Sequence, residues 1–234
     1  MLSMLILIII ASTLIGVGVL FIPVGGAPAA LSTTAGIPTG APMITIGMGV
    51  TGILVTSSVI GNSLPVVLLS GMSASMLMMA ITMLFSNLIH VYGVGVNIAS
   101  STFEKDPITS FNQEEYVSPG TTGHGIPTVS FISGLIGSLL GGLGGSLLYS
   151  AIYEALITNN SFVAQAGVMA ALLTLLVFFV IAVMSSYNIG GTIQGFYDKK
   201  FNIKIKSAFI ASILTAILIA VIYTIIIGGL IYVG

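Results

Sequence analysis

The ionisable side chains of this chain are few and stand in three places. Of its 234 residues, 5 are basic and 6 are acidic, and they lie within residues 104–115, at position 154 and within residues 198–206. Glu154 is the only acid inside a long apolar segment, where an ionised side chain costs about 3 kcal/mol on membrane-insertion scales. The carboxylate either lines a path for a cation or sits at the membrane interface, wetted from outside. Both interpretations stay open, because Asn159 and Asn160 follow closely.

Uncharged side chains that carry oxygen gather near the ends of two other apolar segments. Asn87 lies near the end of the third segment, and Asn188 lies near the end of the fifth with Ser185 and Thr192 close by. Amide and hydroxyl oxygens suit hard cations such as Na⁺, but hydrogen bonds between helices explain these residues equally well. The candidate residues for a Na⁺ path are therefore Glu154, Asn188, Asn87, Ser185 and Thr192.

The remaining chemistry-bearing residues do not form a catalytic set. His90 and His124 each lack a second histidine or a carboxylate at ligand spacing, so they predict no metal site. The glycines of residues 141–145 lie inside an apolar segment with no strand before it, which excludes a dinucleotide or phosphate loop. All five basic residues are lysines, too few for a face that binds phosphates, so nucleic acid is excluded as a partner. We expect no catalytic residue and no bound cofactor in this chain.

The composition requires a membrane environment for these residues. Hydrophobic residues make up 56% of the chain and charged residues only 5%, whereas a soluble domain carries about 25% charged residues. A helix needs roughly 20 apolar residues to cross the bilayer. Six segments meet that length, and they predict an all-α, polytopic integral membrane protein with one transmembrane domain over residues 1–234. We place the six spans at residues 2–22, 41–60, 64–92, 127–153, 162–187 and 207–233.

Two further patterns concern how these spans pack and face. Gly137, Gly141 and Gly145 recur at four-residue spacing in the fourth span, which is typical of a close helix contact in membranes. A stripe of Ala208, Ser212, Ala216 and Ala220 marks the sixth span in the same way. The lysines lie between the third and fourth spans and between the fifth and sixth, so the positive-inside rule places these Gly- and Pro-rich loops in the cytoplasm. Both termini are then extracytoplasmic.

Four strings of residues carry a resemblance to a known family. They are Phe-Ile-Pro-Val-Gly-Gly-Ala-Pro-Ala-Ala at residues 21–30, Ile-Thr-Met-Leu at 81–84 with Asn-Leu-Ile at 87–89, Gly-His-Gly-Ile-Pro-Thr at 123–128, and Ser-Tyr-Asn-Ile-Gly-Gly-Thr-Ile-Gln-Gly-Phe at 186–196. Together they resemble the D subunit of tetrahydromethanopterin S-methyltransferase. The likeness covers nearly the whole chain, and the last string is the most specific.

The resemblance implies a place in methanogenesis. The family belongs to a cell-membrane complex of methanogens that transfers a methyl group from methyltetrahydromethanopterin to coenzyme M and exports Na⁺. It implies that this chain serves the Na⁺-translocating part, with subunits C and E as neighbours that meet the glycine faces. The methyl group is carried by a corrinoid on another subunit, so neither His90 nor His124 is expected to bind the cobalt. A structural scaffold without ion ligands is the alternative role, and a free-standing cation transporter is a third.

The lysine placement generates a test of orientation. Because the chain has no cysteine, a single cysteine at position 199 reports on one loop only. We expect Lys199→Cys to resist a membrane-impermeant thiol reagent in intact cells and to react after the cells are opened, whereas Asn159→Cys, in a predicted outer connection, reacts in both. Labelling of position 199 from outside would overturn the predicted orientation.

Overall fold

The computed structural model describes residues 2–22, 43–99, 104–114, 126–158, 164–182 and 205–233. Apolar residues dominate every helix within these ranges, and two very short strands are the only other regular structure there. The helices are α1 (Leu2–Phe21), η1 (Met43–Val50), α4 (Thr51–Ser58), α5 (Leu64–Leu88), η2 (Ile89–Val94), α6 (Thr128–Thr158), α7 (Ala166–Ala182) and α9 (Ile205–Val233), and the strands are β1 (Ile98–Ala99) and β2 (Gln113–Glu114). Both η1 and η2 are π-helical and continue directly into or out of an α-helix.

A helix overlaps each of the six predicted spans, and α6 continues to Thr158, past the predicted end of the fourth span at residue 153. Four helical stretches are long and apolar enough to cross a membrane, namely Leu2–Phe21, Leu64–Val94, Ser130–Thr158 and Phe209–Ile226. Two more apolar helices, Gly47–Ser58 and Ala166–Ile181, are shorter, and their predicted spans extend into residues outside the described ranges. The all-α membrane class is confirmed, and the number of six spans stays a prediction.

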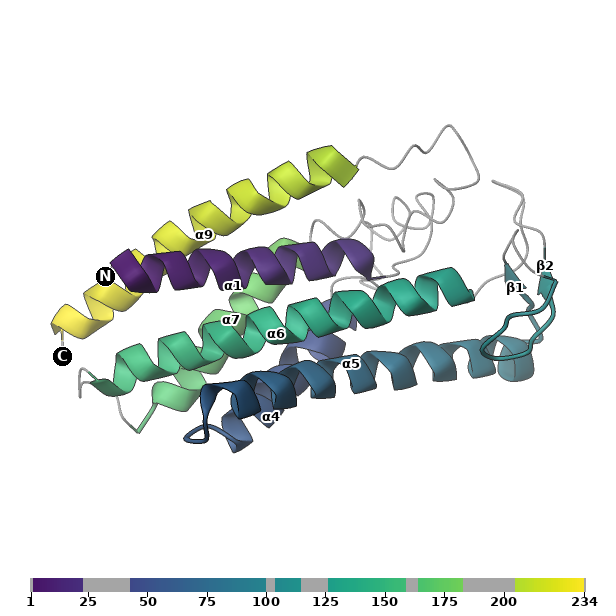
Figure 1. Ribbon diagram of the computed structural model, residues 1–234, viewed down its shortest axis with the longest axis horizontal. Helices are drawn as coiled ribbons and strands as arrows, with labels where there is room; N and C mark the ends of the chain where they lie inside the picture. Colours follow the sequence, from purple (N-terminus) through teal and green to yellow (C-terminus); the bar gives the residue numbers. More distant parts are fainter. Residues whose placement is uncertain are drawn as a thin grey trace.

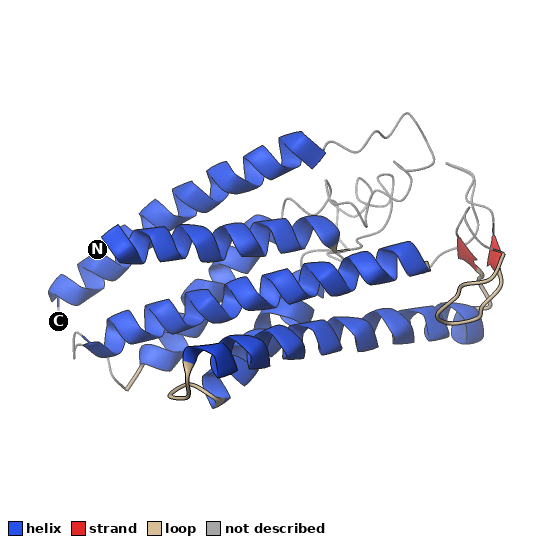
Figure 2. Ribbon diagram, in the orientation of Figure 1, coloured by secondary structure: helices blue, strands red, loops and turns tan. Residues whose placement is uncertain are grey.

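The helices lie side by side along one long axis (Figure 1). Both termini lie at one end of the molecule, together with the link between α4 and α5, and the two strands lie at the opposite end (Figure 1). Helix α6 is the central helix. Of the residues in its most apolar 18-residue stretch 61% are buried, compared with 22% for α5–η2 and 28% for α9. Helices α1 and α5 make the most extensive contacts with α6, and α9 lies outside against α1. Figure 2 shows how completely helices make up the described body.

The two strands were not expected from the sequence, which predicted a loop there. They pair in parallel, with Ile98 opposite Gln113 and Ala99 opposite Glu114. Between them, the carboxylate of the buried Asp106 accepts hydrogen bonds from the Ile108 and Thr109 backbone N–H groups at 2.9 and 3.0 Å and from Gln113 Nε2 at 2.9 Å. In the described part of this loop, these hydrogen bonds to the Asp106 side chain therefore add to the two-residue pairing between the strands.

Glycines bring α1 and α6 into backbone contact. A Cβ atom added at Gly18 would lie 2.5 Å from the Gly137 carbonyl oxygen and 2.6 Å from the Gly141 nitrogen. One at Gly144 would lie 2.5 Å from the Ala11 carbonyl oxygen. Real Cβ atoms do not come so close, so no other residue fits at these positions without moving a helix.

The other glycines of α6 meet the remaining helices of the same chain. A Cβ at Gly145 would lie 2.9 Å from the Phe178 ring of α7, and one at Gly141 would overlap the Met48 side chain of η1. The expectation that the glycine faces meet subunits C and E is therefore wrong for these residues, because helices of this chain already cover them. On α9, Ser212, Ala216 and Ala220 are fully buried, with Gly16 of α1 directly against Ser212; the side chain of Ala208 lies outside the described part.

The packing of Gly141 generates a test. We expect Gly141→Leu to lower the yield of folded protein, because a branched side chain displaces Met48 from the core and such overpacking costs about 1–3 kcal/mol. The matched control is Gly228→Leu on α9, where an added Cβ meets nothing within 4 Å. The measurement is the amount of assembled complex recovered from membranes and its thermal midpoint. Normal assembly of Gly141→Leu with a changed Na⁺ dependence would mean that this face lines an ion path instead.

Candidate functional site

The structure separates the two predicted site residues that it describes. Glu154 lies near the C-terminal end of α6 and Asn87 near the C-terminal end of α5. The first helix end lies at the end of the molecule that carries both termini, and the second lies beside the strands (Figure 1). Nearly the whole length of α6 stands between them. The other three candidates, Asn188, Ser185 and Thr192, lie outside the described residues.

Asn87 is fully buried and clamps the start of α6 to the end of α5. Its Nδ2 donates to the Ile126 carbonyl oxygen at 2.8 Å, and its Oδ1 accepts from the Ile126 N–H at 2.7 Å. Both polar groups of the amide are thus engaged with one backbone residue that is 39 positions away in sequence. This geometry favours the structural interpretation of Asn87 over its role as an ion ligand.

The histidines show no metal site in the described part of the chain. His90 lies in η2, where its Nδ1 is 2.7 Å from the Ser86 carbonyl oxygen. His124 lies outside the described residues. Among the residues that the structure describes, no three His, Cys, Asp or Glu side chains group so that they could hold a metal ion.

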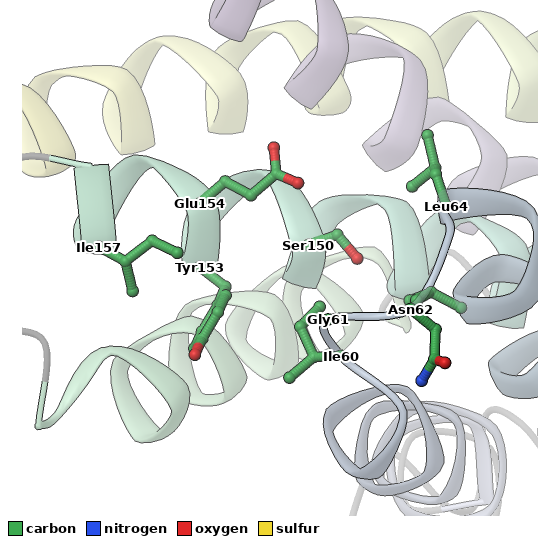
Figure 3. A pocket seen from close by; sticks show the side chains of 9 residues that line it. Ile60, Gly61, Asn62, Leu64, Ser150, Tyr153, Glu154 and Ile157 are labelled. Carbon is green, nitrogen blue, oxygen red and sulfur yellow. The ribbon is translucent and has the colours of Figure 1, made fainter.

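Glu154 lines a pocket between the end of α6 and the link from α4 to α5 (Figure 3). The volume of this pocket is about 270 Å³, which is room for a small cation with several water molecules. Both polar and apolar side chains line it. The lining residues are Ile60, Gly61, Asn62, Leu64, Val67, Ser150, Tyr153, Glu154 and Ile157. We call this space the Glu154 pocket.

The polar side chains of the Glu154 pocket differ in their surroundings. Glu154 itself is solvent-exposed, so its charge needs no buried counter-ion. Ser150, one helical turn earlier, is only 4% exposed, and its hydroxyl has no hydrogen-bond partner among the residues that the structure describes. A buried hydroxyl without a partner costs about 1–3 kcal/mol. Of the polar groups in this pocket, Ser150 is the one that stands to gain most from a ligand.

Further hydroxyl groups follow from the Glu154 pocket toward the middle of α6. The Ser146 hydroxyl donates to the Gly142 carbonyl oxygen at 2.8 Å and lies 2.8 Å from Thr56 Oγ1 of α4. On α5, the Ser75 hydroxyl donates to the Met48 carbonyl oxygen of η1 at 2.8 Å. All three hydroxyl-bearing residues are fully buried. This set was not predicted from the sequence, although Ser146, Ser150 and Glu154 follow one another at four-residue spacing on one face of α6.

Comparison with known proteins points to one family. The sequence model of the family described as the D subunit of tetrahydromethanopterin S-methyltransferase matches residues 1–216. The D subunit of Methanothermobacter thermautotrophicus is 45% identical over 216 residues, which cover 92% of each chain. That of Methanopyrus kandleri is 44% identical over 95% of each chain. That of Methanosarcina mazei is 43% identical over 95% of this chain and 93% of its own. The resemblance carried by the four sequence strings is confirmed.

The Asn87 clamp generates a test of its role. We expect Asn87→Ala to lower the thermal midpoint of the purified protein, at high and low Na⁺ alike, because the Ile126 N–H and carbonyl groups lose partners worth about 1–3 kcal/mol each. Asn97→Ala is the matched control, since Asn97 is exposed and its side chain makes only a 3.5 Å contact to Glu114. A loss of stability that appears only when Na⁺ is removed would instead support a role of Asn87 in ion binding.

Proposed function

This chain belongs to the family of the D subunit of tetrahydromethanopterin S-methyltransferase, and from that membership we propose that it forms part of the membrane portion through which the complex exports Na⁺. The relatives are named as subunits of a methyltransferase, so the chain is a membrane subunit of such a complex. In this proposal the methyl transfer from methyltetrahydromethanopterin to coenzyme M takes place on other subunits, one of which carries the corrinoid. This chain supplies part of the path for the ion.

The Glu154 pocket is the observation that carries the proposal. A carboxylate and the buried hydroxyl of Ser150, which has no partner among the described residues, both line it at the end of an apolar helix. One carboxylate balances the charge of one monovalent cation, and carboxylate and hydroxyl oxygens are ligands that hard cations prefer. The pocket is lined by the end of α6 and the α4–α5 link, and both lie at the end of the molecule that carries the two termini (Figure 1), which the lysine pattern predicts to be the outer side. In this proposal it is the outer mouth of the Na⁺ path.

Coupling between methyl transfer and ion movement has a simple energetic requirement. Loss of the methyl group from the corrinoid must favour one arrangement of the membrane subunits over another, and Na⁺ must bind the two arrangements with different affinity. A difference of tenfold corresponds to about 1.4 kcal/mol. The exposed Glu154, placed where helices of this chain end, is suited to be a ligand in one arrangement and to be released in the other.

A structural scaffold is the second candidate function, and the apolar outer faces of α5 and α9 favour it. Leu69, Leu77 and Phe85 of α5 and Leu214 and Leu218 of α9 are each more than half exposed. Such faces suit contact with lipid or with the helices of neighbouring membrane subunits, for which C and E are our candidates. A scaffold would need no ion ligand, so the effect of Glu154 on Na⁺ dependence separates the two functions.

Substitution of Glu154 tests the proposal. We expect Glu154→Gln to raise the Na⁺ concentration needed for half-maximal methyl transfer by about tenfold, because glutamine keeps the shape of the side chain and removes the charge that attracts the cation. Methylation of the corrinoid, which occurs on other subunits, should keep its rate. The measurement is Na⁺-dependent methyl transfer by the complete complex in reconstituted vesicles.

The matched control for Glu154→Gln is Glu104→Gln. Glu104 is also exposed, but its carbonyl group bonds the β2 residue Gln113 at the opposite end of the molecule (Figure 1). Glu104→Gln should leave the Na⁺ concentration for half-maximal methyl transfer unchanged. Superimposable curves for wild type and Glu154→Gln would exclude the carboxylate from the ion path and leave the scaffold function.

A further inference from the structure

We propose that the cation route continues inward from the Glu154 pocket along a line of buried oxygens where α4, α5 and α6 meet, and that this line ends at a backbone carbonyl of the π-helix η1. The inference rests on the proposed function and deepens it, because it names the ligands behind the mouth. The line consists of the hydroxyl groups of Ser150, Ser146, Thr56 and Ser75 and the carbonyl oxygen of Met48. We call it the hydroxyl line.

Three glycines make room for the hydroxyl line, one on each of the three helices. A Cβ atom at Gly71 of α5 would overlap the hydroxyl groups of Ser146 and Thr56. One at Gly142 of α6 would lie 2.6 Å from the Ser75 hydroxyl, and one at Gly52 of α4 would overlap that same hydroxyl. The polar oxygens of three helices therefore lie over bare glycine backbone rather than over apolar side chains.

The hydrogen bonds along the line have a defined direction. A hydroxyl group has one hydrogen to donate. Ser146 gives its hydrogen to the Gly142 carbonyl oxygen, so Thr56 is the donor in the 2.8 Å bond to Ser146. This leaves the hydroxyl oxygens with lone pairs that neither bond uses. The line can therefore accept a cation without first breaking both of these bonds.

Ser150 is the member of the hydroxyl line that hydrogen bonds within the protein do not explain. Hydrogen bonds between helices account for Ser146, Thr56 and Ser75 as internal contacts. On α6, Ser150 stands one helical turn from both Ser146 and Glu154, is almost fully buried and has no partner among the described residues, yet it lines the Glu154 pocket. An ion or its water shell in the pocket would give its hydroxyl the partner that the helices do not.

The chemistry of the line fits a monovalent hard cation in transit. Its ligands are neutral oxygens, and Glu154 at its mouth supplies one negative charge. Ions pass through a protein when several sites bind them well enough to enter and weakly enough to leave. At the inner end, Met48 lies in a π-helix, a form that is rare and occurs frequently at functional sites.

The test removes one hydroxyl at a time from the complete complex. The variants are Ser150→Ala, Ser146→Ala and Ser75→Ala, and the matched control is Ser12→Ala on α1, another buried hydroxyl without a partner. Two quantities are measured in reconstituted vesicles: uptake of radioactive Na⁺ and the Na⁺ concentration for half-maximal methyl transfer. We expect each of the three variants to raise that concentration by about fivefold, because each loses one oxygen ligand whose contribution is similar to that of a hydrogen bond. Ser12→Ala should leave the concentration unchanged.

The outcomes separate this inference from the proposed function. If Glu154→Gln shifts the Na⁺ dependence and the three hydroxyl variants do not, the hydroxyl line is overturned and the proposed function stands. If none of the four variants shifts it, both are overturned. An equal shift in Ser12→Ala would also overturn the line, because the effect would then belong to any buried hydroxyl.

A second measurement tests the hydroxyl line even if the alanine variants assemble poorly. Ser146→Cys nearly keeps the size of the side chain, and the chain has no cysteine of its own. We expect a small cationic methanethiosulfonate reagent to modify Cys at this position, more slowly when Na⁺ is present. Leu148→Cys, two residues along α6 and equally buried, should stay unmodified. Failure to modify position 146, or modification of both positions at one rate, would overturn the hydroxyl line.

Discussion

The backbone contact between α1 and α6 is the constraint on which the other contacts of this protein depend. Between helices surrounded by lipid there is no hydrophobic gain from association, so close packing must supply the attraction. Gly18, Gly137 and Gly144 remove the side chains that would keep the two helices apart. Once α6 is held in this way, its other glycines place η1, α5 and α7 around it. The interior of the protein is thus set by positions that lack side chains more than by large apolar ones.

Polar groups inside the helical body follow from the same closeness. Helices that approach over glycine leave narrow spaces that fit a serine or threonine hydroxyl and little else. Some of these hydroxyls bond a carbonyl group of their own or a neighbouring helix, as Ser146 and Ser75 do, whereas others such as Ser12 have no partner among the described residues. Asn87 differs from these hydroxyls. Its side chain makes two hydrogen bonds to the backbone of Ile126, just before α6, and so joins the end of α5 to the beginning of α6. Polar residues here both connect helices and, on our proposal, conduct an ion.

The sequence alone predicted the helices well, because the length of an apolar segment is a direct consequence of membrane thickness. It also predicted that Gly137, Gly141 and Gly145 form a packing face, but not which helices they meet, since spacing along one helix carries no information about its neighbour. The pair of short strands escaped prediction because two residues are too few to show a period of two. The hydroxyl line was not predicted for a different reason. Thr56, Ser75 and Ser146 are far apart in the sequence and come together only in the folded protein. For Asn87 the sequence allowed either an ion ligand or a structural hydrogen bond, and its bonds to Ile126 favour the structural interpretation.

The Asn87 clamp restricts how the central helix moves. Helix α6 is uninterrupted from Thr128 to Thr158, and Ile126, two residues before it, is tied to Asn87 at the end of α5. Axial sliding of α6 along α5 by one helical turn, about 5.4 Å, would break both bonds to Ile126. A tilt about the clamp keeps both bonds, and its displacement grows with distance from the pivot. In such a tilt the displacement would be largest at the far end of α6, at Glu154, and would change the space between α6 and the α4–α5 link.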